Sequence, residues 1–541
     1  MVDLILANTG SARPGLYFED EAYTHGEVVA HAHTRAAALA AGGLAGAHVG
    51  VLLENVPEAI FWLEGVALAG GTTVGLNYTR RGLELGRDIR HTHCRLLVTD
   101  TAGVELLADA DVDDIPKAVV DSSGYTDEWI RPYEEADFTA AEVSGQHPFV
   151  LIFTSGTTSA PKAAICTHGR LAAMATGFRR FGLTEDDVAY NSMPWFHSNA
   201  MYVSVGPSIG IGMALALRRR FSASNWIRDV KRYGVTYFNY VGKPLEYILA
   251  TPERPDDADN RVRLGIGNEA NEDDVERFSR RFGVEIRENF GSTEGGITIV
   301  RVPGQPKGAL GVAEGVKVLD PGTGEECPVG RFDEHGRLVN SEEAIGEFVN
   351  STGLGTFEGY YNNDAANRER NRNGWYWSGD LGYRDGAGYL YFAGRGYDWV
   401  RVDGENFAAA PVERILLRHP DVRLVAVYAV PDAHVGDRVM AALRLDDGVT
   451  FDPEGFARFL GEQADLGPKW VPTYVRVVSE LPLTATNKIE KRRLRAERWN
   501  TTDPVWMRDG RGLFLRLMQP GDVEAVEKAI VDSGRAALLS R

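Results

Sequence analysis

The sequence contains few cysteines and no long uninterrupted apolar run. Its 541 residues include 3 cysteines, Cys94, Cys166 and Cys327, without the spacing of a disulfide framework. Such usage indicates a reducing compartment, so we expect a cytoplasmic protein. The most apolar stretch, AIFWLEGVALAGGTTVGL, is interrupted by Glu64 and a glycine pair, which favours a core helix over a membrane span. No basic region followed by an apolar run precedes it, so no signal peptide is expected.

Basic charge is also scarce. The formal net charge is −18 and the isoelectric point is about 5.2, and an acidic chain without a basic stripe argues against nucleic acid as the main partner. The motif HTHC contains His91, His93 and Cys94, but no second ligand cluster accompanies it, so a metal site is not favoured there. The balance of 44% hydrophobic and 25% charged residues is typical of globular proteins.

The first half of the chain alternates short apolar runs with helix-like stretches, which predicts an α/β fold with mostly parallel sheets flanked by helices. Strands are expected at 49–53, 73–76, 95–100, 117–122, 149–156 and 234–242. Residues 310–350 read as a small β-rich subdomain. We predict a large N-terminal domain, 1–395, and a smaller, mobile α+β C-terminal domain, 396–541. The last forty or so residues are partly helix-like, and no chemistry is assigned to them.

One stretch, FTSGTTSAPKAAICTHG, follows an apolar strand and is dense in hydroxyl residues. Backbone N–H groups and hydroxyls in such a loop can surround phosphate oxygens, and Lys162 adds a positive charge. It is not a Walker A loop, because the Gly-Lys-Ser/Thr ending is missing. An ordinary polar turn has the same composition. The candidate phosphate-binding residues are Thr154, Ser155, Gly156, Thr157, Thr158 and Lys162.

Three further motifs could carry chemistry. In ENFGSTEGG, Phe290 could cover a flat base, Thr293 could donate to a phosphate, and Glu294 could hold Mg²⁺. In SGDLGYRDGAGYLYFAGR, Asp380 suits the paired hydroxyls of a ribose, and Arg395 could join it. In LPLTATNKIEKRRL, Lys488 precedes a charged helix, where a loop could deliver it into a cleft. For each motif taken alone, an ordinary turn or a solvated surface segment is the alternative interpretation.

In this order and spacing, the four motifs resemble the adenylate-forming superfamily of acyl-CoA synthetases, peptide-synthetase adenylation domains and luciferases. The resemblance covers roughly residues 15–500. YLYFAGRGYDWVRVDGEN looks more like the fatty-acid-transport and very-long-chain branch, similar to actinobacterial fatty-acid-CoA ligases. The resemblance implies catalytic roles for Lys488, Glu294 and Thr293, and metal binding by Glu294. It further implies nucleotide contacts from Asn268, Glu269, Asn289, Phe290, Gly291, Ser292, Thr293, Asp380 and Arg395.

The same resemblance implies an acyl pocket, a thioesterification face and a hinge. By its position in MPWFHSNA, His197 is expected beside the acid, where it is a candidate both for catalysis and for the acyl pocket. Gly404, Glu405 and Asn406 are expected to approach the site in the CoA step, and Gly396 and Tyr397 form the hinge. The acyl pocket is expected to include His197, Asn199, Tyr240, Val241 and Gly242.

The resemblance therefore implies an acid–thiol ligase that uses ATP, Mg²⁺ and coenzyme A to convert a hydrophobic carboxylic acid to its CoA thioester through acyl-AMP. Ser159 and Ala163 stand where the family has glycine. Because glycine permits positive φ, an enzyme that only passes acyl-AMP to CoA stays an alternative. A silent ligand-binding homologue and a carrier-protein acceptor are others. The acid, fatty or polycyclic, and the oligomeric state, with a homodimer among the options, stay open.

Overall fold

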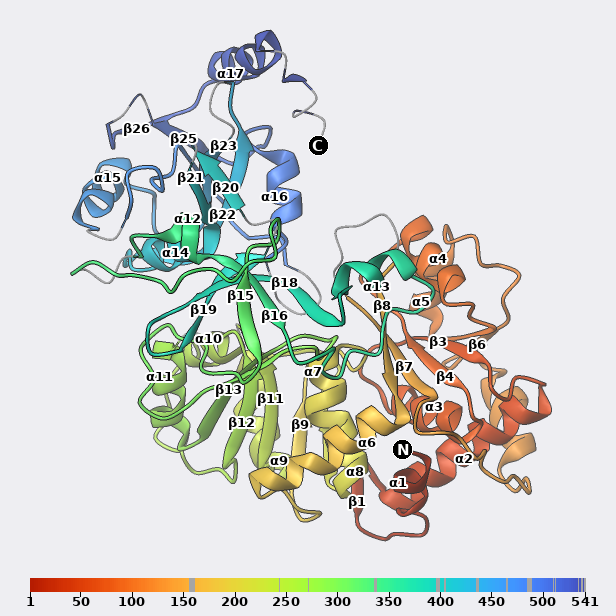
Figure 1. Ribbon diagram of the computed structural model, residues 1–541. Helices are drawn as coiled ribbons and strands as arrows, with labels where there is room; N and C mark the ends of the chain where they lie inside the picture. Colours follow the sequence, from red (N-terminus) through yellow and green to blue (C-terminus); the bar gives the residue numbers. More distant parts are fainter. Residues whose placement is uncertain are drawn as a thin grey trace. The chain divides into compact units, whose positions relative to one another are not determined.

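The computed structural model describes most of the chain and divides it into two compact units. The described residues are 1–154, 161–242, 244–270, 272–334, 338–395, 399–402, 405–433, 437–463, 466–483, 489–508, 510, 512–533, 535, 536 and 539. The first unit comprises Met1–Thr298 and Leu354–Arg372, and the second comprises Ile299–Gly353 and Asn373–Arg541 (Figure 1). The domain boundary expected at 395/396 falls within the second unit and stays a prediction.

The first unit contains a six-stranded sheet in the order β6-β5-β3-β4-β7-β8. All its pairs are parallel except β7–β8. Its central strands are buried on both faces, which explains why they read as continuous apolar runs. The strands are β3 (His48–Leu52), β4 (Thr72–Gly75), β5 (Leu96–Thr99), β6 (Lys117–Val119), β7 (Pro148–Phe153) and β8 (Ala163–Thr167). The five strands expected between 49 and 156 are confirmed.

A second sheet of the same unit positions the candidate site. Its strands follow the order β13-β12-β11-β9-β10-β1-β2, and Figure 1 shows β9, β11, β12 and β13 side by side. Because β11, β12 and β13 are parallel, their carboxyl ends meet at one edge, where α/β proteins bind ligands. The strands are β1 (Pro14–Phe18), β2 (Glu21–Thr24), β9 (Val188–Asn191), β10 (Ala214–Leu217), β11 (Tyr237–Val241), β12 (Leu264–Asn268) and β13 (Glu285–Gly291).

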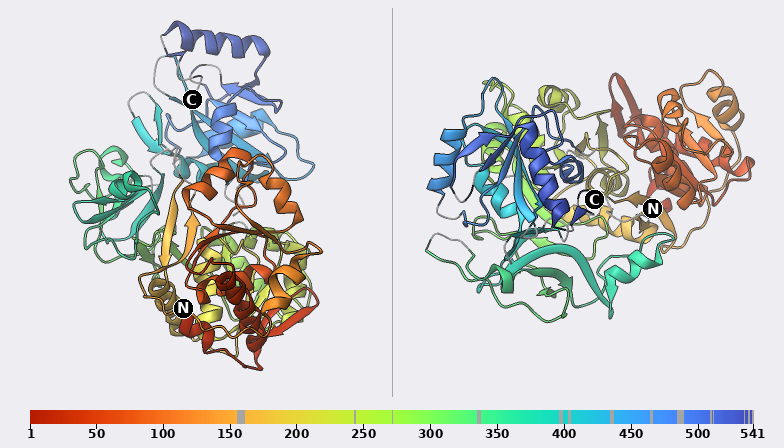
Figure 2. Two further views of the ribbon diagram at one scale, coloured as in Figure 1. Left: turned by 90° about the vertical axis from the view of Figure 1, so that its right-hand side faces the viewer. Right: turned by 90° about the horizontal axis from the view of Figure 1, so that it is seen from above.

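Helices cover these sheets. In both views of Figure 2 the N-terminal residues lie beside the red and orange helices of this unit. The helices are α1 (Val2–Leu6), α2 (His25–Ala41), α3 (Pro57–Leu68), α4 (Gly82–His91), α5 (Thr101–Leu107), η1 (Thr126–Ile130), η2 (Arg131–Tyr133), α6 (His168–Gly177), η3 (Phe178–Phe181), α7 (Ser198–Ala200), η4 (Met201–Val205), α8 (Gly206–Ile211), α9 (Ala223–Tyr233), α10 (Pro244–Leu249), α11 (Glu272–Phe282) and α13 (Asp364–Arg370).

The apolar stretch around Glu64 forms α3, a helix buried almost all round. It packs against α2, whose start is stabilised by a capping box between Thr24 and Glu27. Trp62 donates a hydrogen bond to the Tyr125 hydroxyl at 2.9 Å. The expectation of a core helix is confirmed, and no helix within the described residues has the length and hydropathy needed to cross a membrane.

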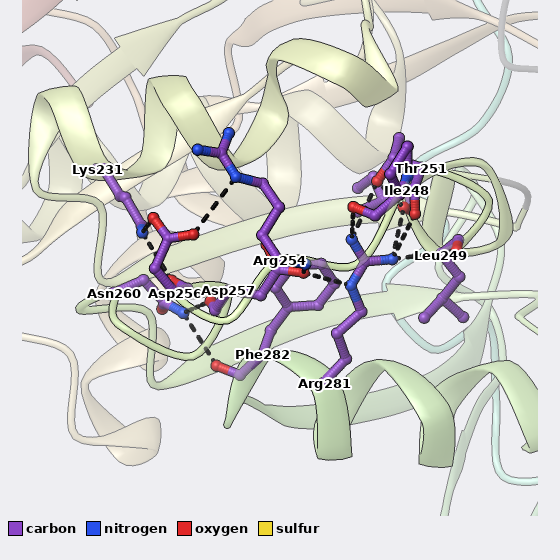
Figure 3. Close-up of polar contacts among 11 residues, drawn as sticks. Lys231, Ile248, Leu249, Thr251, Arg254, Asp256, Asp257, Asn260, Arg281 and Phe282 are labelled. Atoms are coloured by element: carbon purple, nitrogen blue, oxygen red, sulfur yellow. Dashed lines mark hydrogen bonds and ion pairs between the residues drawn. The ribbon is translucent and has the colours of Figure 1, made fainter.

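A buried arginine ties α11 to the segment after α10 (Figure 3). The Arg281 Nε donates to Asp257 Oδ2 at 2.7 Å, and both side chains are at most 7% exposed. The two terminal nitrogens donate to the carbonyl oxygens of Leu249, Thr251 and Pro252, at 2.9 to 3.1 Å. A charge so deeply buried is tolerated because a carboxylate and several carbonyls surround it.

The second unit contains the expected β-rich part. The strands β15 (Val316–Leu319), β16 (Gly346–Asn350), β18 (Trp375–Arg384) and β19 (Leu390–Arg395) pair antiparallel in that order. A short helix, α12 (Ser341–Ala344), precedes β16. Two short strands, β14 (Thr298–Val300) and β17 (Asn371–Arg372), lie where the chain passes between the units.

The C-terminal part is α+β, as expected, with a sheet in the order β22-β23-β24-β25-β26 and a separate hairpin of β20 and β21. Its strands are β20 (Trp399–Val402), β21 (Glu405–Ala408), β22 (Val422–Pro431), β23 (Asp437–Leu445), β24 (Tyr474–Val477), β25 (Val505–Arg508) and β26 (Leu515–Leu517). Its helices are α14 (Ala409–Leu416), α15 (Pro453–Glu462), α16 (Lys491–Glu497) and α17 (Pro520–Asp532). The last forty residues thus add two sheet strands that sequence reasoning did not predict, besides a helix.

Candidate active site

A chain of asparagine side chains lies at the carboxyl ends of β9, β11 and β12. The Asn239 amide donates to Asn191 Oδ1 at 3.1 Å and to Asn199 Oδ1 at 2.7 Å. The Asn199 amide in turn donates to the Tyr240 carbonyl at 3.1 Å and to Asn268 Oδ1 at 3.4 Å. The structure thus brings the predicted residues Asn199 and Asn268 together, and Asn239, which was not predicted, connects them to β9.

The residue after β12 has an unusual backbone. Glu269 has a positive φ of 68°, a region in which non-glycine residues are uncommon and which is often found at functional sites. Its side-chain Oε1 accepts a hydrogen bond from Asn268 at 3.3 Å. Gly242, after β11, also has a positive φ, of 59°, and its N–H donates to the Asn268 carbonyl at 2.7 Å. These turns hold the two strand ends next to each other at the predicted adenine position.

The loop after β13 is held in place at Thr293. Its hydroxyl donates to Ser198 Oγ at 2.8 Å. Its carbonyl accepts hydrogen bonds from Arg170 Nη2 at 2.8 Å and from the Tyr202 hydroxyl at 3.2 Å. The Arg170 guanidinium also lies over the Tyr202 ring, 5.0 Å from its centre. The preceding residues Asn289, Phe290 and Ser292 are half-buried, and Gly291 is exposed.

Sequence reasoning missed Ser198, Tyr202 and Arg170. Ser198 stood inside the motif MPWFHSNA but was not singled out, and Arg170 lies directly after the hydroxyl-rich motif. Each reaches Thr293 across 91 to 123 residues of chain, so no local pattern could have identified the contact.

The predicted metal ligand, Glu294, is 7% exposed. Its Oε1 accepts a hydrogen bond from the Tyr360 hydroxyl at 2.6 Å. Burial, with a smaller contribution from Glu294, raises the pKa of Tyr360 well above its ordinary value, so this phenol is a donor at neutral pH. No group of three or more His, Cys, Asp or Glu side chains among the described residues could cage a metal ion. A single carboxylate fits Mg²⁺ that arrives with substrate phosphates, which supply the other ligands.

Lys162 lies beside the same tyrosine. Its side chain is 9% exposed, its Nζ is 3.4 Å from Glu369 Oε2, and it lies over the Tyr360 ring at 5.7 Å. The Thr154 N–H donates to the Lys162 carbonyl at 2.9 Å, so the two ends of the hydroxyl-rich loop are joined. The structure therefore brings two predicted residues to Tyr360: Lys162 lies over its ring and Glu294 accepts a hydrogen bond from its hydroxyl.

The predicted acyl-pocket residues on β11 lie on opposite faces of the strand. Val241 packs against Met193 and Ala200, whereas Tyr240 packs in the cluster that contains Trp226. The Tyr240 hydroxyl donates to Glu288 Oε1 at 2.5 Å. Asn239 shares the face of Val241 because side chains alternate along a strand. His197 is half-buried just before α7, and its ring packs 4.8 Å from that of Phe196.

Asp380 and Arg395 belong to the second unit and lie opposite each other in the β18–β19 pair. Asp380 is 5% exposed, and its N–H donates to Ser378 Oγ at 3.0 Å. Next to it, the Gly379 N–H donates to Glu347 Oε1 at 2.6 Å. Because these contacts hold the backbone of β18 at Asp380, its carboxylate has a rigid support.

Several predicted residues lie outside the described part of the chain. Two predicted residues of the CoA step, Glu405 and Asn406, do lie within the described part: they begin β21 and pair with Val402 and Arg401. The predicted residues that the structure does not describe are Ser155, Gly156, Thr157, Thr158, Gly396, Tyr397, Gly404 and Lys488, together with Ser159.

Known proteins resemble the chain over nearly its whole length. Steroid-22-oyl-CoA synthetase of Rhodococcus jostii is 46% identical over 516 residues, which cover 94% of this chain and 93% of that protein. Medium/long-chain-fatty-acid–CoA ligase FadD17 of Mycobacterium marinum is 49% identical over 496 residues, with 91% and 95% covered. Among solved structures, ATP-bound MatB from Rhodopseudomonas palustris superposes with a TM-score of 0.78 at 24% identity, covering 91% of this chain and 98% of that one.

Two protein families match consecutive parts of the chain. The AMP-binding enzyme family matches residues 6–361, and the AMP-binding enzyme C-terminal domain matches residues 411–488. The first match includes the hydroxyl-rich loop, the asparagine network and the Thr293–Glu294 loop described above. The resemblance to adenylate-forming enzymes is confirmed, and the chain belongs to the AMP-binding enzyme family.

Proposed function

We propose that the protein is an acyl-CoA ligase, which activates a hydrophobic carboxylic acid with ATP and transfers the acyl group to coenzyme A. The observation that carries the proposal is the convergence of Lys162 and Glu294 on Tyr360, at a place that suits the phosphates of a nucleotide. Membership of the AMP-binding family and the two relatives, which are a CoA synthetase and a CoA ligase, support it.

In the first half-reaction a carboxylate oxygen of the acid attacks the α-phosphorus of ATP, which releases pyrophosphate and leaves acyl-AMP. Lys162 attracts the phosphates, and the Thr293 hydroxyl, which points to Ser198, turns to donate to a phosphate oxygen. Mg²⁺ bound at Glu294 would offset negative charge on the phosphates. Lys488, by its family position, stabilises the charge that builds at the α-phosphate.

The nucleoside contacts follow from the family positions of the predicted residues. Asn268 and Glu269 line the adenine, Phe290 covers it, and Asp380 with Arg395 binds the ribose hydroxyls. Such contacts orient the reactants and reduce the entropic cost of the reaction. In the second half-reaction the CoA sulfur attacks the acyl carbon, and AMP leaves.

The change between half-reactions requires a second domain orientation. We place the boundary at 395/396, with Gly396 and Tyr397 as the hinge, so that Lys488 withdraws and Gly404, Glu405 and Asn406 approach the acyl carbon. The acid lies along His197, Asn199 and Val241. Tyr240 and Gly242 are the other two proposed pocket residues. The Tyr240 carbonyl accepts a hydrogen bond from the Asn199 side chain and so helps to position that side chain. The cytoplasm is the proposed location, because the cysteines are few and unpaired.

A ligase with both half-reactions is favoured over an enzyme that only transfers acyl-AMP. Ala163, one of the two residues that replace a family glycine, is the first residue of β8 and pairs with Phe153. It is not among the described non-glycine residues with positive φ. A glycine is therefore not needed at this position, and the alanine fits the strand without strain.

The test is to measure pyrophosphate release and CoA-thioester formation in parallel, with long-chain fatty acids and steroid-22-oic acids as the two arms of the panel. We expect pyrophosphate release that depends on the acid and matches thioester formation in rate. Thioester formation from synthetic acyl-AMP without pyrophosphate release from any acid would contradict the proposal. In that case the double variant Ser159→Gly with Ala163→Gly shows whether the loop is the cause.

A further inference from the structure

The segment 358–363, just before α13, runs along β8 and is joined to it at both ends. Glu358 accepts hydrogen bonds from the N–H and the hydroxyl of Thr167, at 2.9 and 2.6 Å. The Tyr361 N–H donates to the Ala163 carbonyl at 2.8 Å, and the Asn363 side chain donates to the Pro161 carbonyl at 3.0 Å. The segment therefore follows the chain that leaves the hydroxyl-rich loop, and its position is fixed by that chain.

Tyr360 is the most constrained residue of this segment. It is 2% exposed. The Asn367 side chain accepts from its N–H at 2.6 Å and donates to its carbonyl at 3.0 Å. Its hydroxyl donates to Glu294 Oε1 and accepts a hydrogen bond from Arg370 Nε at 3.3 Å. Both the backbone and the hydroxyl are thus held, so the phenol cannot rotate away from Glu294 without breaking several hydrogen bonds.

The contact uses one oxygen of the carboxylate. Glu294 Oε2 accepts no hydrogen bond from any side chain or backbone group in the described part of the chain, whereas Oε1 is 2.6 Å from the phenol. A carboxylate held through one oxygen presents the other in a defined direction. Partners of this kind orient metal ligands and tune their affinity.

Two neighbouring residues of α13 contact Lys162 and Tyr360. Glu369, which is exposed, pairs with Lys162, and Arg370 contacts the Tyr360 hydroxyl. Because Glu369 is exposed and its carboxylate lies 3.4 Å from Lys162 Nζ, water can solvate it when phosphates displace it from Lys162. The hydroxyl of Tyr360, in contrast, is buried and charge-assisted in its contact with Glu294.

We propose that Tyr360 is a positioning residue, whose hydroxyl orients the Glu294 carboxylate toward the divalent cation that accompanies ATP. The inference rests on the proposed function, because that function assigns the cation to Glu294. A purely structural tyrosine would support folding and leave the metal dependence of nucleotide binding unchanged.

The experiment compares Tyr360→Phe with Tyr361→Phe, a matched control whose lost hydroxyl contacts His93 Nδ1 at 2.9 Å. Equilibrium dissociation constants for ATP are measured by calorimetry across a range of Mg²⁺ concentrations and with Mg²⁺ removed by a chelator. We expect Tyr360→Phe to raise the half-saturating Mg²⁺ concentration about tenfold. Binding of metal-free ATP and the control variant should stay within about twofold of wild type.

Glu294→Gln tests the assignment of the cation site separately from the positioning role of Tyr360. If it leaves the Mg²⁺ dependence unchanged, the cation site itself is wrongly assigned. If it removes the dependence while Tyr360→Phe behaves as wild type, the positioning role is wrong and the proposed function stands. Melting temperatures without ligand identify folding defects. If Tyr360→Phe does not fold, Arg370→Gln replaces it, and a smaller rise in the same direction is expected, whereas no rise overturns the inference.

Discussion

The Thr293 hydroxyl donates to Ser198 Oγ across 2.8 Å, although 95 residues separate them. The contact joins the start of α7 to the loop after β13, next to Glu294. Together with the hydrogen bonds of Arg170 and Tyr202 to the Thr293 carbonyl, it holds the loop in one arrangement.

We predict that Ser198→Ala slows adenylation, because the Ser198 hydroxyl can no longer donate to Thr293 Oγ1 and orient it once the Thr293 hydroxyl turns to a phosphate. One neutral hydrogen bond is worth about 1 kcal/mol, so kcat/KM for ATP should fall by roughly threefold to tenfold, and further in Thr293→Ala. The control is Ser204→Ala, which removes another buried hydroxyl, one with no hydrogen-bond partner in the described structure. Equal losses in both serine variants, measured by pyrophosphate release, would contradict the role of Ser198.

Lys488→Ala should stop acyl-AMP formation from acid and ATP while sparing thioester formation from synthetic acyl-AMP, since the family lysine acts in one domain orientation only. The loss could reach about 3–4 kcal/mol of transition-state stabilisation. Lys491→Ala is the control, because Lys491 is engaged with Glu413 at 2.8 Å. The two half-reactions are assayed separately, and a similar loss in both would reject the assignment.

Replacing Arg281 should strongly destabilise the first unit. Arg281→Met leaves Asp257 buried without its cation, and breaking a buried pair in this way costs about 3–5 kcal/mol. Arg254→Gln is the control in Figure 3, since Arg254 is largely exposed and contacts Asp256 only at 3.4 Å. Chemical denaturation measures both. A loss for Arg281→Met no larger than that of the control would show that the network adds little.

Glu64 should make the protein less stable as pH rises. Burial raises the pKa of Glu64 to about 8, in a cavity that it lines with His25 and Ser208. The unfolded chain loses this proton near pH 4.5, so stability falls between about pH 4.5 and 8. Glu64→Gln should remove that slope and gain roughly 4 kcal/mol at pH 8. Denaturation curves at several pH values, with exposed Glu105→Gln as control, test this; parallel curves for Glu64→Gln and wild type would contradict it.

His168 should make the protein less stable as pH falls. Burial, with smaller contributions from the N-terminal amino group and His147, lowers the pKa of His168 to about 4, and neither ring nitrogen has a partner among the described residues. The unfolded chain binds this proton below about pH 6.5, so stability is lost between about pH 6.5 and 4. His168→Phe should recover about 1 kcal/mol at pH 5. Thermal melts at pH 7 and 5 that shift equally in both proteins would exclude the effect.

The α/β class, six strands of the first unit (β3, β4, β5, β6, β7 and β11) and the family could be predicted from the amino-acid sequence alone. Buried parallel strands such as β4 and β5 read as apolar runs because both of their faces are covered. The order of four motifs, each weak alone, was specific because a chance match must satisfy all four spacings. Local patterns also predicted phosphate or metal contacts for Thr154, Lys162 and Glu294, whereas Asn268 was predicted from the family resemblance. These assignments stay predictions.

The contacts between distant residues depend on the tertiary structure. Tyr360 contacts Glu294 across 66 residues of chain, Ser198 contacts Thr293, and β25 and β26 join the C-terminal sheet through β24. Strand alternation places Asn239 and Val241 on one face of β11 and Tyr240 on the other. Such partnerships depend on strand order and on packing between distant segments. Periodicity and motif spacing report the conformation of neighbours in the chain, so they carry no information about these contacts.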